Sequence, residues 1–177
     1  MRTRIIFTLY IVLGASSVFA QEAGKFRAGF EEGYLFPSKT GSFGFLGAIE
    51  LKYNLQNNMN VGLKVEAATT AGFTCYGADV LSLFISYEYY FHSTGRRSSP
   101  FLGAGFGYCF SEVLDCAYYG SRHAKFNNPT CFIRAGYEIR KFRVSLTYNL
   151  IRNPNAKYYL DYASLNVGFY IGGGKWK

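Results

Sequence analysis

Three side chains with the chemistry of a hydrolytic centre lie close together in the sequence: Asp115, Ser121 and His123. A nucleophilic hydroxyl, a histidine base and a carboxylate carry out acyl transfer, but only when the fold brings them into hydrogen-bonding geometry. Nearness in sequence does not supply that geometry, and Ser and Asp are ordinary loop residues. We therefore predict no catalytic residue, no cofactor and no metal site.

The first 20 residues have the composition of a secretory signal peptide. Arg2 and Arg4 precede an apolar run at residues 5–15, and Val18 and Ala20 provide small residues before a cleavage point. We expect residues 1–20 to be removed and the mature chain to begin at Gln21. The chain is therefore expected to be exported.

Disulfide chemistry is available to four cysteines: Cys75, Cys109, Cys116 and Cys131. An even number of cysteines in an exported chain suggests disulfides, and the lack of a CxxC pair argues against a structural zinc site. Cys109 ends one predicted strand and Cys131 begins the next. We expect these two to be bridged at the rim of the fold and Cys75 to be bridged to Cys116, with the two other pairings still open.

Eight short segments after the signal alternate apolar with polar or small residues. In one of them, Phe142, Val144, Leu146, Tyr148 and Leu150 fall on one face, and Arg143, Ser145, Thr147 and Asn149 fall on the other. Strand side chains alternate with period two, so we predict strands at 25–36, 43–54, 59–69, 79–92, 100–110, 131–140, 142–151 and 160–171. An even number of amphipathic strands is typical of a closed antiparallel barrel in lipid.

The polar face of these strands carries charges of both signs. They are Arg27, Glu31, Glu50, Lys52, Lys64, Glu66, Glu88, Arg134, Glu138, Arg140 and Arg143. Buried charges are costly unless paired, so we predict a salt-bridge network in the lumen of the barrel. A register slip by one residue would instead turn them to lipid, at about 2 to 4 kcal/mol for each Arg or Lys near the midplane. Glu32 falls on the apolar face, where we expect a bulge or a position near the headgroups.

Glycines at 103, 105 and 107 form a GxGxG run that resembles a phosphate-binding loop. That fingerprint needs a strand-to-helix turn, whereas here the glycines alternate with Leu102, Ala104, Phe106 and Tyr108 along one strand. We expect them to be steric, leaving room inside the barrel for large side chains such as Arg134, Phe84 or Tyr90.

Composition agrees with a barrel in lipid. Aromatic residues make up 19% of the chain and charged residues only 17%, below the roughly 25% of soluble domains. Residues 21–177 contain no apolar run long enough for a membrane helix, and Tyr and Phe suit girdles at the two headgroup levels. The net charge is +8, or +6 without Arg2 and Arg4, and the basic residues are scattered, so nucleic acid is not an expected partner.

Loop lengths orient the predicted barrel. Residues 56–58 and 140–141 are tight connections, whereas residues 111–130 form a long stretch without periodicity. Such barrels have short periplasmic turns and longer extracellular loops. We therefore place residues 111–130, the third outer loop, outside the cell.

The last strand reads Asn166, Val167, Gly168, Phe169, Tyr170 and Ile171. With the signal peptide and the eight segments, it makes the chain resemble the small outer-membrane β-barrel proteins of Gram-negative bacteria, of the porin-family type typified by the OmpA barrel domain and OmpX. The resemblance covers nearly all of residues 21–177. It implies an all-β, eight-stranded antiparallel up-and-down transmembrane barrel in the outer membrane.

The resemblance also implies insertion by the barrel-assembly machinery, which reads a signal in the last strand. Asn166, Gly168, Phe169 and Ile171 match the core of that signal. Residues 172–177 then follow, so the terminal aromatic of the family is missing and Trp176 is only penultimate.

Three other functions are alternatives to a structural or adhesive role. A few barrels of this kind act on lipids through His, Ser and an acid in their outer loops, which makes a lipid-modifying enzyme with Ser121, His123 and Asp115 the sharper alternative. A pore is disfavoured because eight strands leave space only for packed side chains. A secreted, lipocalin-like soluble barrel would place the apolar face inside.

The sequence therefore favours a monomeric outer-membrane barrel with a structural or adhesive role. Its expected partners are outer-membrane lipid, lipopolysaccharide and a surface ligand. On position and charge, Arg122, His123 and Lys125 are the expected contacts for anionic lipopolysaccharide or another anionic polymer.

Overall fold

The computed structural model describes residues 22–38, 43–71, 76–91, 98–117, 120–151 and 161–173, with the backbone alone at 71, 76–77, 113–117 and 120–124. Its strands are β1 (Phe26–Pro37), β2 (Phe43–Gln56), β3 (Met59–Ala71), β4 (Tyr76–Tyr90), β5 (Ser98–Ala117), β6 (Gly120–Ile139), β7 (Phe142–Ile151) and β8 (Tyr162–Gly172). The predicted all-β, eight-stranded barrel is confirmed. The predicted signal peptide lies outside the described residues.

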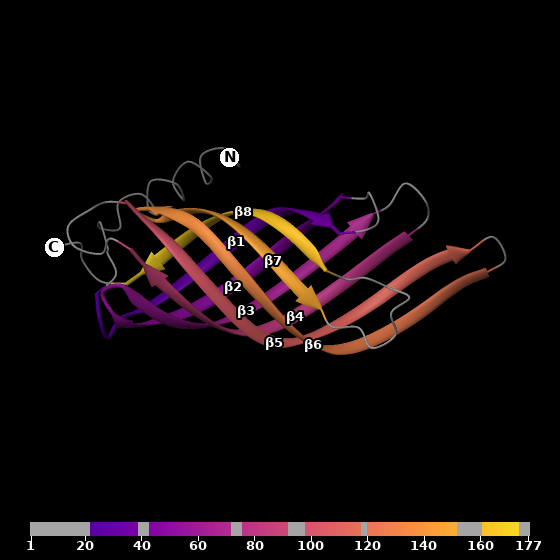
Figure 1. Cartoon of the computed structure of the whole chain (residues 1–177), viewed down its shortest axis with the longest axis horizontal. Helices are drawn as coiled ribbons and strands as arrows, with labels where there is room; N and C mark the ends of the chain where they lie inside the picture. The colour runs from indigo at the N-terminus through magenta and orange to yellow at the C-terminus, as the bar shows by residue number, and fades with distance from the viewer. Residues whose placement is uncertain are drawn as a thin grey trace, which may run out of the picture.

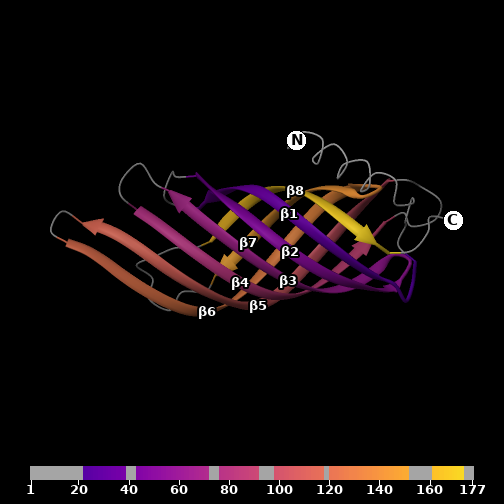
Figure 2. The same cartoon turned by 180° about the vertical axis from the view of Figure 1, so that it is seen from behind.

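The sheet closes on itself. Each strand pairs antiparallel with the next, and β1 pairs with β8 from Arg27 opposite Gly172 to Pro37 opposite Tyr162. Figure 1, and Figure 2 from behind, show the strands running obliquely around the barrel. Closure gives the barrel strands hydrogen-bonding neighbours on both sides, as the backbone requires in hydrocarbon.

Alternation of side chains sets the two surfaces of the barrel. Along β7, every residue from Phe142 to Ile151 switches between exposed and buried, and β2 alternates in the same way over most of its length. Because the exposed set is apolar and the buried set is largely polar, the barrel is inverted relative to a water-soluble protein. This sidedness is the reverse of a lipocalin-like soluble barrel.

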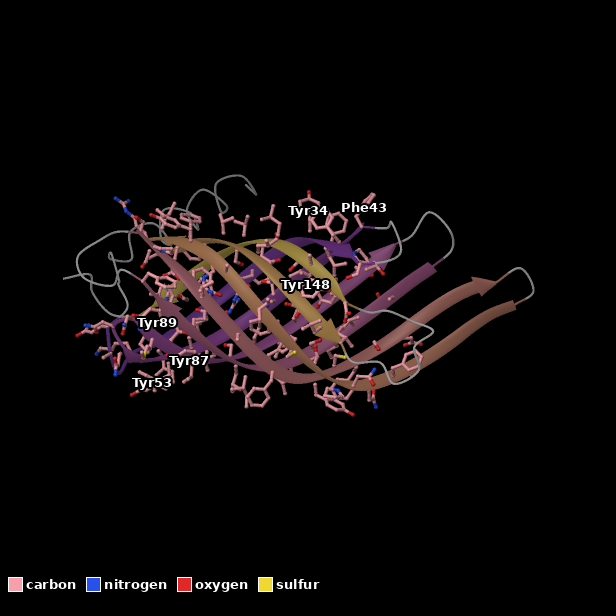
Figure 3. All side chains as sticks on the ribbon, viewed as in Figure 1. Tyr34, Phe43, Tyr53, Tyr87, Tyr89 and Tyr148 are labelled. Carbon is pink, nitrogen blue, oxygen red and sulfur yellow. The ribbon has the colours of Figure 1, made fainter. Side chains whose placement is uncertain are left out.

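The outer surface is an apolar belt, and aromatic side chains form a level near each end of it. Tyr53, Tyr87 and Tyr89 lie toward the end where β1 begins, and Tyr34, Phe43 and Tyr148 lie nearer the other end (Figure 3). Between these levels the exposed side chains include Leu83, Ile85 and Leu146. Tyr and Phe at two levels around an aliphatic belt are typical of girdles at the membrane interfaces. No helix among the described residues is long and apolar enough to cross a membrane.

The largest difference from the sequence prediction is in residues 111–130. They were expected to form a loop, but β5 and β6 continue through most of this stretch and pair from Ser98 opposite Ile139 to Ala117 opposite Gly120. The barrel ends earlier, because β6 pairs with β7 only from Thr130 onward. The paired residues 111–117 and 120–129 are called the β5–β6 hairpin below. β4 lies beside its β5 arm as far as Asp115, and the end of the hairpin projects beyond the other strands (Figures 1 and 2).

Period two was absent from the hairpin for a physical reason. Outside lipid, paired strands have no apolar environment on one face, so cross-strand hydrogen bonds can form without alternating hydrophobicity. The sequence signal that located the other strands is therefore missing here.

Of the two alternatives expected for Glu32, the bulge is wrong, and the position near the headgroups stays a prediction. The register passes through this residue without a shift, with Gly47 opposite it on β2 and Val167 opposite it on β8. The register shift that the structure has lies between Asn54 and Gln56, beside the β2–β3 turn. Glu32 is exposed and therefore faces outward from the middle of β1.

Candidate functional site

A network of ionised side chains fills the end of the lumen nearer the start of β1. Ten charged side chains are buried there, and we call them the ionic core: Arg27, Glu31, Glu50, Lys52, Lys64, Glu66, Glu88, Arg134, Glu138 and Arg143. They come from β1, β2, β3, β4, β6 and β7. All ten were expected in the lumen from the sequence.

Arg134 of β6 links carboxylates from three other strands. Its guanidinium lies 3.1 Å from Glu31 Oε2 and 2.9 Å from Glu50 Oε1, and it also pairs with Glu88. Its Cζ is 5.2 Å from the centroid of the Phe132 ring. One cation thus ties β1, β2 and β4 to β6 across the lumen.

Arg143 of β7 makes the second set of links. Its Nη1 lies 2.8 Å from Glu88 Oε1, and its Nη2 lies 2.9 Å from Glu138 Oε2. The guanidinium sits between two rings, with Cζ 4.2 Å from the centroid of Phe101 and 4.3 Å from that of Tyr170. Cation–π contacts on both faces add to the ion pairs and fix the plane of the fork.

Arg140 is the one member of the predicted set that the structure places elsewhere. β6 ends at Ile139, and Arg140 is an exposed residue of the β6–β7 turn with a φ of 57°. A left-handed residue is typical of a tight hairpin turn, and the strand's alternation ends there. Without Arg140, the ionic core contains five cations and five carboxylates and is formally neutral.

Two buried tyrosines complete the network, and sequence analysis did not assign them to it. The hydroxyl of Tyr170 lies 2.6 Å from both Glu31 and Glu50, and that of Tyr90 lies 3.0 Å from both Glu88 and Glu138. Each hydroxyl can donate to one carboxylate at a time and accept from a cation. Tyr170 is two residues after Gly168 and Tyr90 is two residues after Glu88, so both lie on the inward face of their strands. This parity could have revealed them.

Toward the hairpin end, the lumen holds a cluster of buried hydrophobic residues beside buried uncharged polar side chains such as Asn149 and Ser164. The buried cluster there, which we call the apolar cap, consists of Leu35, Leu46, Ala68, Ala78, Val80, Cys109, Ile151 and Tyr162. Lys64 and Glu66 lie at the boundary, 2.5 Å apart, and the Tyr162 hydroxyl donates to Glu66. The ion pairs expected in the lumen therefore do not extend into this end, where the hydrophobic cluster lies.

The glycine run of β5 makes room for the core, as expected, although for partly different neighbours. A Cβ on Gly105 would overlap the Phe132 ring, and one on Gly103 would lie 2.9 Å from Glu88 Cγ. Gly107 is closely approached by the backbone of β4 at Leu83 and Phe84. The run is a packing feature of one strand.

The predicted Cys109–Cys131 disulfide is wrong. Cys109 is buried in the apolar cap, whereas Cys131 is exposed on the outer surface, and the two residues are paired with Asn128 and Phe106. Their parity differs, so the thiols point to opposite faces of the sheet. Cys75 lies outside the described residues, and only the backbone of Cys116 is described, so their pairing stays a prediction.

The residues expected to contact a ligand lie on the β5–β6 hairpin. Arg122 is opposite Asp115, His123 is opposite Leu114, and Lys125 is opposite Glu112. The Lys125 ammonium is 77% exposed and lies 3.5 Å from Glu112 Oε2. Residues of opposite charge are thus register partners at two positions of the hairpin.

The structure does not test the hydrolytic alternative. Ser121 is opposite Cys116 and Asp115 is opposite Arg122, but the side chains of Ser121, Asp115 and His123 are not described. Among the described residues, no group of three or more His, Cys, Asp and Glu is arranged to hold a metal ion.

Solved structures with the same architecture are all-β membrane barrels. Neisserial surface protein A matches with a TM-score of 0.67 at 15% identity, over 84% of this chain and 97% of that one. The N-terminal β-barrel domain of Pseudomonas aeruginosa OprF matches with a TM-score of 0.54 at 17% identity, over 85% and 100%. The outer membrane enzyme PagL matches with a TM-score of 0.55 at 14% identity, over 82% and 98%.

No protein-family model and no curated protein sequence matches the chain. The structural neighbours are small barrels of the bacterial outer membrane, and the fold of this chain is theirs. Because a surface protein and an enzyme are both among them, the fold does not assign catalysis.

Proposed function

We propose that this protein is an integral outer-membrane barrel that holds the β5–β6 hairpin clear of the bilayer as a surface for interaction. The observation that carries the proposal is the unequal length of the strands. β5 and β6 each have 20 residues, whereas β7 has 10, so paired backbone extends past the apolar belt on one side.

The barrel is suited to be a rigid support. A neutral ionic core ties six of its strands together, and the apolar cap closes the lumen below the hairpin. Side chains fill an eight-stranded interior, so a structural role fits this lumen better than conduction. The outward apolar belt between two aromatic levels supports a place in a membrane, and the fold comparison supports the outer membrane.

An anionic surface polymer is the ligand class we propose for the hairpin, with Arg122, His123 and Lys125 as contacts. Lys125 is highly exposed, and its ion pair with Glu112 at 3.5 Å is solvent-accessible and weak enough to be exchanged. Because acidic residues face Arg122 and Lys125, we expect modest affinity that falls steeply with salt.

Removal of the hairpin tests the proposal. Ser111 is opposite Phe126, so residues 112–125 can be replaced by Asn-Gly, which favours a tight two-residue turn. We expect the shortened protein to keep a heat-modifiable band on gels and to lose binding to lipopolysaccharide vesicles and to a sulfated polysaccharide surface. Unchanged binding by the folded, shortened protein would refute the role of the hairpin.

Substitution within the full-length hairpin tests the ligand class. Alanine at Arg122, His123 and Lys125 together should weaken binding to both surfaces. The matched control replaces Lys141, a cation of the β6–β7 turn at the opposite end of the barrel, by alanine. If the triple variant and the control bind equally well, the ligand is not recognised by these charges.

A further inference from the structure

Glu32 is a carboxylate on the apolar outer face of the barrel. It is exposed, and its neighbours along β1 on the same face are Phe30 and Tyr34, which are 50% and 57% exposed. The register places Gly47 beside it on β2 and Val167 beside it on β8. An ionisable group in such a belt is costly to keep there and is a candidate for a specific contact.

The surface next to Glu32 is hollowed by two small residues. A Cβ on Gly47 would have no atom within 4 Å, and Ala67, the exposed residue opposite Gly47 on β3, has only a methyl side chain. Larger side chains border this row on both sides. Phe45 and Tyr34, with ring centroids 5.2 Å apart, lie on the hairpin side. The hollow formed by Glu32, Gly47 and Ala67 is called the outer notch.

The outer notch lies just inside one aromatic level of the belt. Tyr34 belongs to that level (Figure 3), and Glu32 is two residues before it, about 7 Å along the strand. A glutamate side chain at this depth can extend toward the headgroups while the notch beside it remains in the acyl region. The notch therefore has a charged end near the interface and an apolar floor.

The described part of the chain provides no cation for this carboxylate. The exposed cations that the structure describes are Lys25 and Arg140 at the opposite end of the barrel, and Lys125 on the hairpin. With no positive group facing it from the described residues, the carboxylate is open to an external cation, and in a bilayer a primary ammonium on a lipid headgroup is at the required depth.

We propose that the outer notch binds a membrane lipid with an ammonium headgroup, of the ethanolamine class. The ammonium pairs with Glu32, and one acyl chain lies over Gly47 and Ala67 against Phe45. This inference rests on the proposed membrane-spanning function and adds to it a lipid class and a position on the barrel.

Lipid retention by the protein tests the proposed preference for an ammonium headgroup directly. The full protein is placed in nanodiscs with equal amounts of phosphatidylethanolamine and phosphatidylglycerol, and the lipids that stay bound are counted by native mass spectrometry. We expect phosphatidylethanolamine to be enriched by about two- to five-fold, the range for a solvent-accessible ion pair. Glu32→Gln should remove the enrichment, and Gly47→Leu should remove it by filling the notch.

Two matched controls separate the notch from a general effect on the belt. Ala28→Leu adds the same side chain at a small, exposed position of β1, opposite Leu51, and Glu112→Gln removes a carboxylate from the hairpin. Both should keep the enrichment. A heat-modifiable band for each variant shows that the barrel is intact, so loss of lipid preference is distinguished from failure of the proposed barrel.

Four outcomes of the nanodisc measurement would overturn the proposal. They are equal retention of the two lipids by the wild type, enrichment that survives Glu32→Gln, a preference for phosphatidylglycerol that requires Mg²⁺, and a concentration-dependent dimer lost in Glu32→Gln. The third would indicate a bridging cation, and the fourth would indicate a second copy of the chain.

A fifth overturning outcome comes from free ethanolamine added to phosphatidylglycerol nanodiscs. The protein should not retain it, because it lacks the acyl chain. Retention of ethanolamine that is lost in Glu32→Gln would mean that headgroup chemistry alone explains the contact and that the notch is not a lipid site.

Discussion

Arg134 is the residue whose loss should cost the barrel most. It is the shared partner of Glu31, Glu50 and Glu88, all of which are buried. Removing one partner of a buried ion pair leaves uncompensated charge, which typically costs about 3 to 5 kcal/mol. We expect Arg134→Ala to lower the free energy of unfolding by that order, measured by urea titration in detergent with circular dichroism and gel mobility.

Arg140 provides a matched control for this experiment. It is also an arginine and lies six residues after Arg134, but it is exposed in the β6–β7 turn. Arg140→Gln should change the free energy of unfolding by less than about 0.5 kcal/mol, as usual for surface substitutions. Equal destabilisation by the two variants would mean that the ionic core does not hold the barrel together.

The two described thiols should differ in reactivity. Cys131 is exposed on the outer surface, and Cys109 has no exposed area. In the folded protein, a small apolar maleimide should label Cys131 and should reach Cys109 only after unfolding. Peptide mapping by mass spectrometry locates the label. A Cys109–Cys131 disulfide in the native protein, seen without reductant, would contradict the register of β5 and β6.

At the scale of elements, the hairpin has fewer strand neighbours than the barrel. Over residues 120–129, β6 pairs with β5, and the described part of the chain contains no strand on its other side. β5 keeps β4 as a second neighbour only as far as Asp115. A small open sheet with few strands is less stable in water than the closed and packed barrel below it. The hairpin should therefore open locally more often than the barrel does.

Proteolysis of intact cells should detect this difference. Trypsin should cleave after Arg122 and Lys125, which are in the hairpin, and should spare Lys52, Lys64 and Arg143, which are inside the barrel. Mass spectrometry of the released and retained fragments checks both statements. Protection of Arg122 and Lys125 on cells, with cleavage only after the membrane is broken, would place the hairpin on the periplasmic side.

Elements in contact with lipid could be predicted from the sequence, and the others could not. The alternation of apolar and polar residues predicted the bounds of β1 to β4, β7 and β8 to within a few residues, because one face of each strand must be apolar. It failed for residues 111–130, which lie beyond the belt. Within the lumen, parity predicted ten of the eleven charges, and it failed for Arg140 because the strand ends before that residue. It missed the apolar cap, because inward residues such as Leu35 and Ile151 do not form one cluster in the sequence.

Viewed as a whole, the molecule has three layers along its axis. The ionic core lies at the end where the chain enters β1. The apolar cap lies next to it on the side of the hairpin, and the hairpin projects from that end of the barrel. In the core, neutral overall charge and many cross-strand ion pairs favour a single register, since a slip would separate them. The cap places buried apolar side chains on that side of the core, and ion pairs are stronger in a low dielectric.

Sidedness is the property of the whole molecule on which the other arguments depend, and spin labels can measure it. Nitroxides at Leu83→Cys and Leu146→Cys, both about half exposed in the belt, should be accessible to oxygen and inaccessible to a water-soluble nickel complex. A label at Asn57, an exposed residue of the β2–β3 turn, should show the reverse, and one at Ser145, which is 1% exposed, should be inaccessible to both. The three patterns distinguish lipid, water and packed lumen in one set of samples, after the native cysteines are replaced by serine. A soluble barrel would give a different result, because Leu83 and Leu146 would be shielded from both reagents and Ser145 would be reached by the nickel complex.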